Sequence, residues 1–253
     1  MAERIDGVYE EAVASRLLPG VSVIAGDRDD GLLSLDQDVG DLIPRMGKHG
    51  IITGFENGSA KLAPKSVPVT LRMLLSHTSG QEYDWMNPVL GQWRAGRNEE
   101  PFSGPTVNNK CSIPLVFTPG TSFAYGAGYD WAGKVVEIAT KTTLEEFMRA
   151  RIWAPLGIEQ DFSFFPQNKK GMKARMAEFS TLGEKGQPPA VDFLSYDMLG
   201  GTTDCIGGGG IYTSAKGYYT FLSALLRWDL GFLTLHPSTN FFGLSWMRGA
   251  SRR

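Results

Sequence analysis

Cysteine and histidine are scarce in this chain: only 2 of its 253 residues are cysteine and only 3 are histidine. Two cysteines are too few for a disulfide framework, and together with three scattered histidines they make no zinc cluster. We expect both Cys111 and Cys205 to be small buried apolar side chains. The composition therefore predicts no metal site and no disulfide scaffold.

The chain also has no membrane signal and no excess of either charge. No window approaches the roughly 18 apolar residues of a membrane-spanning helix, and the polar start of the sequence has no apolar core like that of a signal peptide. Lysine and arginine number 25 against 27 acidic residues, a formal net charge of -2. This balance argues against binding to nucleic acid or to an anionic membrane surface. We expect a cytoplasmic protein.

Several motifs of other enzyme classes are missing. No Gly-x-Ser-x-Gly elbow occurs, which counts against an α/β-hydrolase, and no Lys-Ser/Thr pair follows the glycine run 207–210, which favours a tight backbone approach over a phosphate loop. Thr213 and Ser214 stand at a predicted helix start, where they are expected to cap the helix. Ser76 and His77 are adjacent, so on a helix they would not face each other. None of these sets predicts a nucleophile.

The length suits one large domain or two small ones. Residues 47–69, 81–114 and 159–205 are predicted to be irregular. A strand at 21–25 has no hairpin partner beside it, which indicates a deletion between Asp30 and Gly31. Apolar periodicity and end signals predict helices at 3–18, 37–43, 69–75, 129–140, 143–152 and 215–227.

The most informative stretch is residues 117–137, FTPGTSFAYGAGYDWAGKVVE. A Pro-Gly turn leads into a short extended run, then a tyrosine in a loop of small residues, then an amphipathic helix. Gly126, Ala127 and Gly128 leave the ring of Tyr125 little local cover. We therefore expect its hydroxyl to project into a cleft. The alternative is a buried tyrosine whose hydroxyl is hydrogen-bonded inside the protein.

Further motifs flank this stretch in a fixed order. They are GLLSLDQDV at 31–39, LRMLLSHTSG at 71–80, Pro119-Gly120, APLGI at 154–158 and GGGGIYTS at 207–214. The ordered series resembles the serine β-lactamase-related family, which includes class C-like esterases. The resemblance is closest to fungal acyltransferases that acylate polyketides, of the lovastatin transesterase type. It covers about residues 31–230, and its most specific part is 125–133.

The resemblance implies a fold and a chemistry. The fold class is α/β of the α+β type, β-lactamase/transpeptidase-like, here mostly the helical part with an incomplete antiparallel sheet. The family's serine, three residues before a lysine on one helix, forms an acyl-enzyme with an ester or thioester. A phenol with its usual pKa of about 10 becomes a usable proton shuttle when a lysine ammonium favours the phenolate. The resemblance gives this position to Tyr125 and makes His77 a structural hydrogen-bonder beside the cleft. No metal and no organic cofactor is required.

The chain departs from the family at two places. No serine in it is followed three residues later by lysine; the resemblance places that motif directly before Gly31, at the expected deletion. The family's late Lys-Thr-Gly strand, which would follow residue 230, has no match. We therefore expect a β-lactamase-related domain over 1–230, with an internal deletion near 30/31, and an unmatched tail over 231–253.

Two functions remain open. The first is a serine acyltransferase or esterase lineage that moves acyl groups to or from small metabolites, with esters or thioesters as partners, linked to CoA or to an acyl carrier protein. The second is a catalytically dead remnant or a non-enzymatic small-molecule binder, because the nucleophile and its lysine are missing. Trp85, Trp93 and Trp131 fit either a core or a substrate wall. The incomplete sheet predicts exposed apolar surface and poor solubility.

Overall fold

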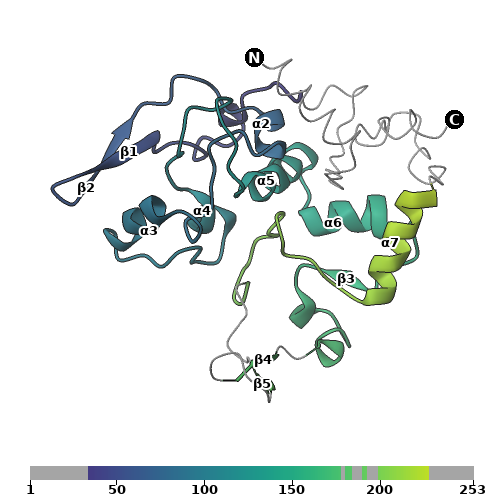
Figure 1. The fold of residues 1–253 in the computed structure, drawn as a ribbon. Helices are drawn as coiled ribbons and strands as arrows, with labels where there is room; N and C mark the ends of the chain where they lie inside the picture. The colour runs from purple at the N-terminus through teal and green to yellow at the C-terminus, as the bar shows by residue number, and fades with distance from the viewer. Residues whose placement is uncertain (1–33, 178–179, 184–189, 193–198, 228–253) are drawn as a thin grey trace, which may run out of the picture.

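The structure is a computed structural model, and it describes residues 34–177, 180–183, 190–192 and 199–227 (Figure 1). The predicted helix at 3–18, the strand at 21–25, the 30/31 junction and the tail at 231–253 lie outside the described residues. Within the described part, no helix is both long and apolar enough to cross a membrane.

Short helices make up most of the regular secondary structure in the described residues. The α-helices are α2 (Leu71–Leu75), α3 (Pro88–Ala95), α4 (Val107–Cys111), α5 (Gly128–Thr140), α6 (Leu144–Met148) and α7 (Ala215–Arg227). Four further helical turns are η1 (Val39–Asp41), η2 (Arg149–Trp153), η3 (Pro166–Asn168) and η4 (Lys173–Arg175). The predicted helices at 69–75, 129–140, 143–152 and 215–227 are confirmed, with the third one split between α6 and the π-helical turn η2.

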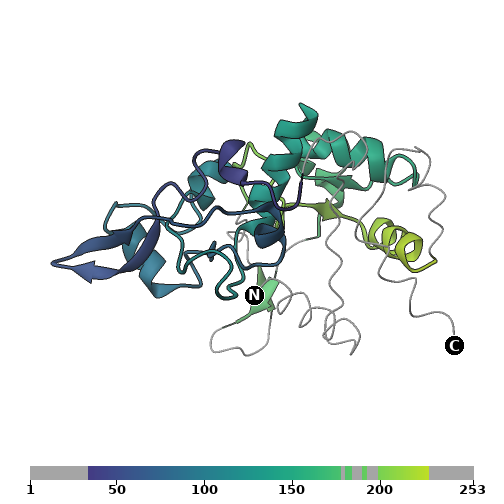
Figure 2. The same cartoon turned by 90° about the horizontal axis from the view of Figure 1, so that it is seen from above.

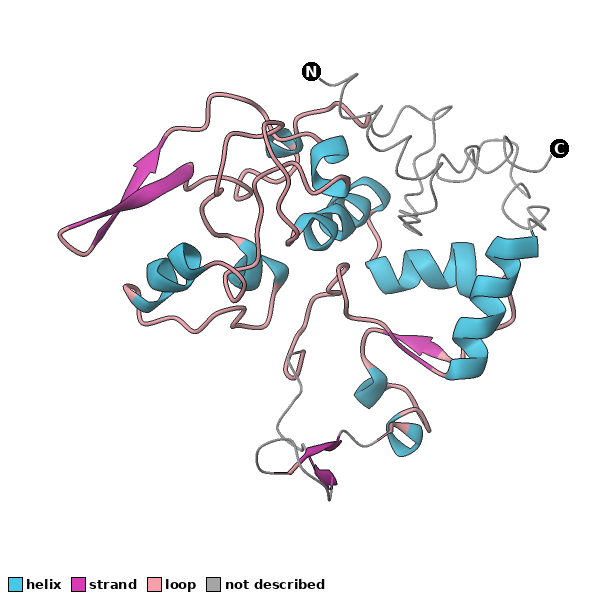
Figure 3. Cartoon of the chain, in the orientation of Figure 1, coloured by secondary structure: helices cyan, strands magenta, loops and turns pink. Residues whose placement is uncertain are grey.

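The strands form small antiparallel pairs. They are β1 (Ile51–Glu56), β2 (Ser59–Ala63), β3 (Phe162–Ser163), β4 (Ser180–Leu182), β5 (Ala190–Asp192) and β6 (Tyr212–Thr213). Over the described residues, β1 pairs with β2, β3 with β6 and β4 with β5, and no sheet has more than two strands. Figure 3 shows the β1-β2 and β4-β5 pairs at outer ends of the structure, away from the central helices. This agrees with the predicted fold, which is mostly the helical part of the domain with an incomplete antiparallel sheet.

The prediction of an irregular segment at 47–69 was wrong. This segment contains the β1-β2 hairpin, whose turn is made by Asn57 at φ +50° and Gly58 at φ +78°. An Asn-Gly pair accepts such left-handed backbone and is a strong hairpin signal. Figure 2 shows the tip of the hairpin extending away from the helices. The base of β1 is anchored in the core, where Ile52 packs with Leu90 and Trp93 and its N–H donates to the carbonyl oxygen of Leu115 at 2.8 Å.

The prediction of an irregular segment at 81–114 was also wrong, because α3 and α4 lie within it. Asn87 caps α3 and Pro88 occupies its first turn, while Thr106 and Asn109 form a capping box on α4. These are ordinary helix-start signals. The predicted irregular segment at 159–205 does contain only short elements in its described residues, namely β3, η3, η4, β4 and β5.

Helix α5 lies at the centre of the main core and positions the tyrosine loop that precedes it. Its Trp131 and Val135 pack in one buried cluster with Leu74 of α2 and Leu115. Thr70 caps α2, accepting a hydrogen bond from the Met73 N–H at 3.3 Å. A second buried cluster joins α5 and α6 to β3 through Val136, Leu144, Trp153 and Phe162. The tyrosine loop therefore leads into α5, a helix that both buried clusters hold in place.

Candidate functional site

Tyr125 stands at the end of the loop that leads into α5, and its side chain is 48% exposed. Among the described residues, its hydroxyl makes no hydrogen bond. The structure thus differs from the alternative of a buried tyrosine with a satisfied hydroxyl. A phenol that is half exposed and unpaired is available to a ligand.

Glycines on either side hold the tyrosine loop against its neighbours. A Cβ atom added to Gly126 would lie 2.0 Å from the carbonyl oxygen of Gln81, and one added to Gly128 would lie 2.0 Å from that of Leu74. Real Cβ atoms do not approach backbone so closely, so both positions need glycine. The small residues around Tyr125 therefore serve close packing, a reason that the sequence did not reveal.

His77 contacts the same loop through both its ring and its backbone. Its Nδ1 accepts a hydrogen bond from the Gly126 N–H at 3.3 Å, and its carbonyl oxygen accepts one from the Ala124 N–H at 3.0 Å. Its ring centroid lies 4.8 Å from that of Tyr125. Burial holds the pKa of His77 below its usual value, which favours the neutral ring that this acceptor role requires. The predicted role of His77 as a structural hydrogen-bonder is confirmed.

An aromatic surface surrounds Tyr125. Phe123 is 61% and Trp85 is 49% exposed. Between Trp85 and Tyr125 lies Tyr83, whose ring stacks on Trp85 at 5.4 Å and meets Tyr125 edge-on at 5.7 Å. We call Trp85, Phe123 and Tyr125 the aromatic face. Of the three tryptophans in question, Trp93 and Trp131 are buried in the core, so Trp85 alone can act as a wall for a ligand.

The hydroxyl groups of Ser76 and Ser214, neither of which is a predicted nucleophile, make structural hydrogen bonds. The Ser76 hydroxyl donates to the carbonyl oxygen of Arg72 at 2.9 Å and lies 2.9 Å from the Thr78 hydroxyl. Ser214 caps α7, where its hydroxyl accepts a hydrogen bond from the Gly217 N–H at 2.9 Å. The predicted cap is therefore made by Ser214, whereas Thr213 lies in β6 and its hydroxyl donates to the carbonyl oxygen of Ser214 at 3.3 Å. Neither serine hydroxyl is paired with a base.

The glycine run makes the tight backbone approach that was predicted. A Cβ atom on Gly207 would lie 2.4 Å from the carbonyl oxygen of Tyr129. The neighbouring Gly208 N–H donates to the carboxylate of Asp130 at 2.8 Å. Asp130 and Tyr83 were missed in the sequence, although an acidic residue among the apolar positions of 129–140 is a usable signal for a buried carboxylate.

Both cysteines are buried, as predicted. Burial raises the pKa of the Cys111 thiol well above its usual value and that of Cys205 to about 12. A protonated, inaccessible thiol is a poor nucleophile. Neither cysteine replaces the missing serine.

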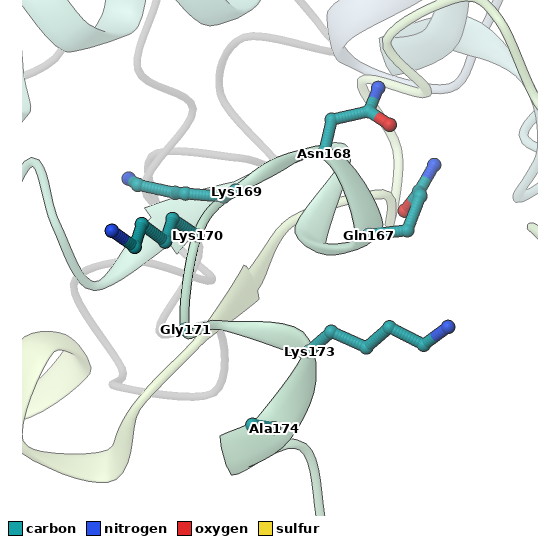
Figure 4. A pocket seen from close by; sticks show the side chains of 7 residues that line it. All are labelled: Gln167, Asn168, Lys169, Lys170, Gly171, Lys173 and Ala174. Carbon is teal, nitrogen blue, oxygen red and sulfur yellow. The ribbon is translucent and has the colours of Figure 1, made fainter.

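A surface hollow elsewhere in the molecule is unrelated to Tyr125. Its lining residues are Gln167, Asn168, Lys169, Lys170, Gly171, Lys173 and Ala174 (Figure 4). All of them belong to the continuous segment that runs from η3 through the connecting turn into η4. Figure 4 shows the Lys169 and Lys170 side chains on the opposite side of the loop from Lys173, so the ammonium groups do not converge on one anion.

Comparisons with known proteins bear on the tyrosine loop and on the fold. The Beta-lactamase family model matches residues 20–250. The chain is 34% identical over 229 residues to a lovastatin esterase of Penicillium rubens, covering 90% of this chain and 57% of the relative. It is 32% identical over 237 residues to a monacolin J acid methylbutanoyltransferase of Aspergillus terreus, covering 93% and 56%. The chain thus spans somewhat over half the length of the curated relatives it matches.

Solved structures agree. A variant of simvastatin synthase from Aspergillus terreus matches with a TM-score of 0.70 at 34% identity, over 80% of this chain and 47% of that one. The unliganded selenomethionyl enzyme from the same organism matches with a TM-score of 0.68 at 26% identity, over 90% and 69%. The predicted resemblance and the β-lactamase/transpeptidase-like fold class are therefore confirmed. The chain belongs to the Beta-lactamase family.

Proposed function

We propose that this chain comes from an acyltransferase/esterase lineage and retains the tyrosine side of an acyl-transfer site, without the means to turn over by itself. The observation that carries this proposal is Tyr125, half exposed and without a hydrogen-bond partner among the described residues, in a loop fixed by Gly126, Gly128 and His77. The relatives' names, an esterase and a methylbutanoyltransferase, support the class of reaction.

In the lineage, the serine oxygen would bond to the acyl carbon of an ester or thioester, and the alcohol or thiol would leave. The tyrosine would carry the serine proton to that leaving group. No serine of this chain precedes a lysine by three residues. The described lysines nearest the core are committed elsewhere: Lys110 donates to the Phe102 carbonyl oxygen, and Lys134 pairs with Glu137 and Asp204. Among the described residues, neither of these ammonium groups is free to serve Tyr125, which supports the proposal that the chain does not catalyse the reaction by itself.

The partner we propose is a small apolar metabolite carried as an acyl ester or thioester, the latter linked to CoA or to an acyl carrier protein. The aromatic face of Trp85, Phe123 and Tyr125 offers apolar surface to an acyl chain and one phenol to its carbonyl oxygen. This fits secondary metabolism of the polyketide type and a cytoplasmic location. We propose no cofactor, no nucleic acid and no membrane as partner.

The experiment combines p-nitrophenyl butyrate with a fluorophosphonate probe. We expect no burst of p-nitrophenol and no covalent labelling, since loss of a nucleophile commonly removes several orders of magnitude in rate. The ester should still perturb the ring signals of Tyr125 in NMR spectra, and the Tyr125→Phe variant identifies those signals. Burst release or labelling would show an active serine enzyme; no perturbation at Tyr125 would remove the binding role.

The domain division is a second proposal. We propose one β-lactamase-related domain over 1–230, with an internal deletion near 30/31, followed by the separate tail 231–253. Genomic DNA across the 30/31 junction tests the deletion directly. A reading frame that encodes Ser-x-x-Lys at this junction supports it, and uninterrupted coding sequence identical to the present chain contradicts it.

A further inference from the structure

Asp130, in the first turn of α5, is a fully buried carboxyl group with 0% exposure. Its Oδ1 accepts a hydrogen bond from the Gly208 N–H at 2.8 Å, and its Oδ2 accepts one from the Tyr83 hydroxyl at 2.8 Å. The Cys111 thiol lies 3.9 Å from the same Oδ2. Burial raises the pKa of Asp130, whereas the Gly208 N–H and the Tyr83 hydroxyl oppose this change. Because both oxygens accept hydrogen bonds, the geometry fits the ionised carboxylate.

The three donors come from three different parts of the chain. Tyr83 belongs to the loop after α2, Cys111 ends α4, and Gly208 belongs to the glycine run. A Cβ atom on Gly208 would lie 2.7 Å from the Tyr83 hydroxyl oxygen and 2.9 Å from Asp130 Oδ1. Glycine at this position is therefore a condition for the contact. Asp130 joins these segments to the start of α5.

Tyr83 links the buried Asp130 carboxylate to the exposed rings of Trp85 and Tyr125. Its side chain is buried, and burial together with the Asp130 carboxylate raises the pKa of its hydroxyl, so the hydroxyl remains a donor. Its ring stacks on Trp85, with centroids 5.4 Å apart, and contacts Tyr125 edge-on at 5.7 Å. One hydrogen bond at the inner end of Tyr83 thus fixes a ring that lies between two members of the aromatic face.

We infer that Asp130 is a positioning residue for the aromatic face: its carboxylate orients Tyr83, and Tyr83 orients Trp85 and Tyr125. Loss of the hydrogen bond frees the inner end of the Tyr83 ring, and Trp85 then samples more than one position. The effect on ligand binding rests on the proposed function, but the effect on Trp85 does not.

The test follows the NMR resonance of Trp85 in the full chain labelled with 5-fluorotryptophan, which the Trp85→Phe variant assigns. Asp130→Asn weakens the acceptor, and Tyr83→Phe keeps the ring but removes the donor. We expect both to shift or broaden the Trp85 resonance, and the double variant to add little to either single change, because both remove one interaction.

Glu145→Gln is the matched control. Glu145 also accepts hydrogen bonds, from the Ser163 hydroxyl and the Phe164 N–H, but in the second core cluster. A purely structural role for Asp130 predicts lower stability in both acid-to-amide variants and an unmoved Trp85 resonance in both. An unmoved resonance in Tyr83→Phe, or an equal shift in Glu145→Gln, would overturn the inference. If Asp130→Asn does not fold, Tyr83→Phe decides alone.

Binding of p-nitrophenyl butyrate gives the second measurement. We expect Tyr83→Phe to weaken binding by about tenfold or less, in keeping with the loss of one hydrogen bond to a charged group that acts only through position. If the unaltered protein shows no binding while Trp85 still responds to Tyr83→Phe, the proposed function fails and the positioning role stands. If binding is intact and Trp85 does not respond, the proposed function stands and the positioning role of Asp130 fails.

Discussion

Gly126 lies so close to the turn before α3 that no larger residue fits without movement of backbone. Its added Cβ would meet the Gln81 carbonyl oxygen at 2.0 Å and the Glu82 Cα at 2.5 Å. We expect Gly126→Ala to lower the free energy of unfolding by about 2–3 kcal/mol, because backbone cannot give way as a side chain can. Gly209→Ala is the control, since nothing lies within 4 Å of its Cβ position. Urea unfolding midpoints compare the two; equal losses would contradict the close approach.

His77 gives the molecule a pH dependence. Burial lowers its pKa in the folded state, so between that value and the ordinary 6.5 the unfolded chain binds more protons than the folded one. Stability is then fully present above about pH 7 and falls as pH decreases through about 6.5. His77→Asn, whose side chain tolerates the left-handed backbone at φ +55°, should flatten this slope.

His49 should preserve part of the pH dependence of stability in the His77→Asn variant. Burial, with the nearby Lys48 and Arg97 charges, also lowers the pKa of His49, so the variant should retain part of the dependence. Denaturant unfolding at pH 5.5, 6.5 and 7.5 measures it. An unchanged slope in His77→Asn would show that the His77 ring is not the group that titrates.

At the scale of elements, the buried Arg94 of α3 holds this helix to Asp84 in the loop before it by an ion pair, and to α4 by hydrogen bonds to backbone. Arg94 of α3 donates to Asp84 at 2.7 Å, with side chains only 4% and 1% exposed, and also to the carbonyl oxygens of Asn109 and Lys110. Arg94 thus connects the loop that carries Trp85 to both α3 and α4. The irregular appearance of 81–114 in the sequence arises because these contacts, and not a long apolar period, fix the two short helices.

We expect Arg94→Met to reduce the free energy of unfolding by about 3–5 kcal/mol, because it leaves the Asp84 carboxylate buried without its partner. Arg97→Met, in the turn directly after α3, is the matched control. Arg97 is half exposed, pairs with Glu99 at 3.0 Å and lies over the Trp93 ring, so its loss should amount to about 1 kcal/mol or less. Thermal and urea unfolding give both values. Similar losses in the two variants would show that burial of the Arg94 pair has no special weight.

The whole molecule exposes large apolar side chains on more than one element. Besides the aromatic face, α7 exposes Tyr218, Tyr219 and Leu222. We expect strong binding of an anilinonaphthalene dye and a thermal midpoint below ~60 °C, because small two-stranded sheets give these surfaces little cover. A sharp cooperative melt above ~60 °C without dye binding would contradict this expectation.

Local patterns were enough to predict most helices and the identity of the family, but not the arrangement of the site. The helices at α2, α5 and α7 follow from caps and apolar spacing that lie within each segment. The β1-β2 hairpin was missed although Asn57-Gly58 carries a local signal. The contacts of Asp130 could not be predicted, because its donors lie 47, 19 and 78 residues away in the chain, and no local period links such positions.

The close approaches at Gly126, Gly128 and Gly207 also change how the Tyr-Gly-Ala-Gly motif should be interpreted in related chains. Each of these glycines is required by backbone that lies against it, whether or not the site turns over. A gene that has lost its nucleophile would still be penalised for changing them as long as its product must fold. An intact glycine pattern around Tyr125 is therefore a signature of selection on folding, and only the residues that face the ligand can reveal selection on catalysis.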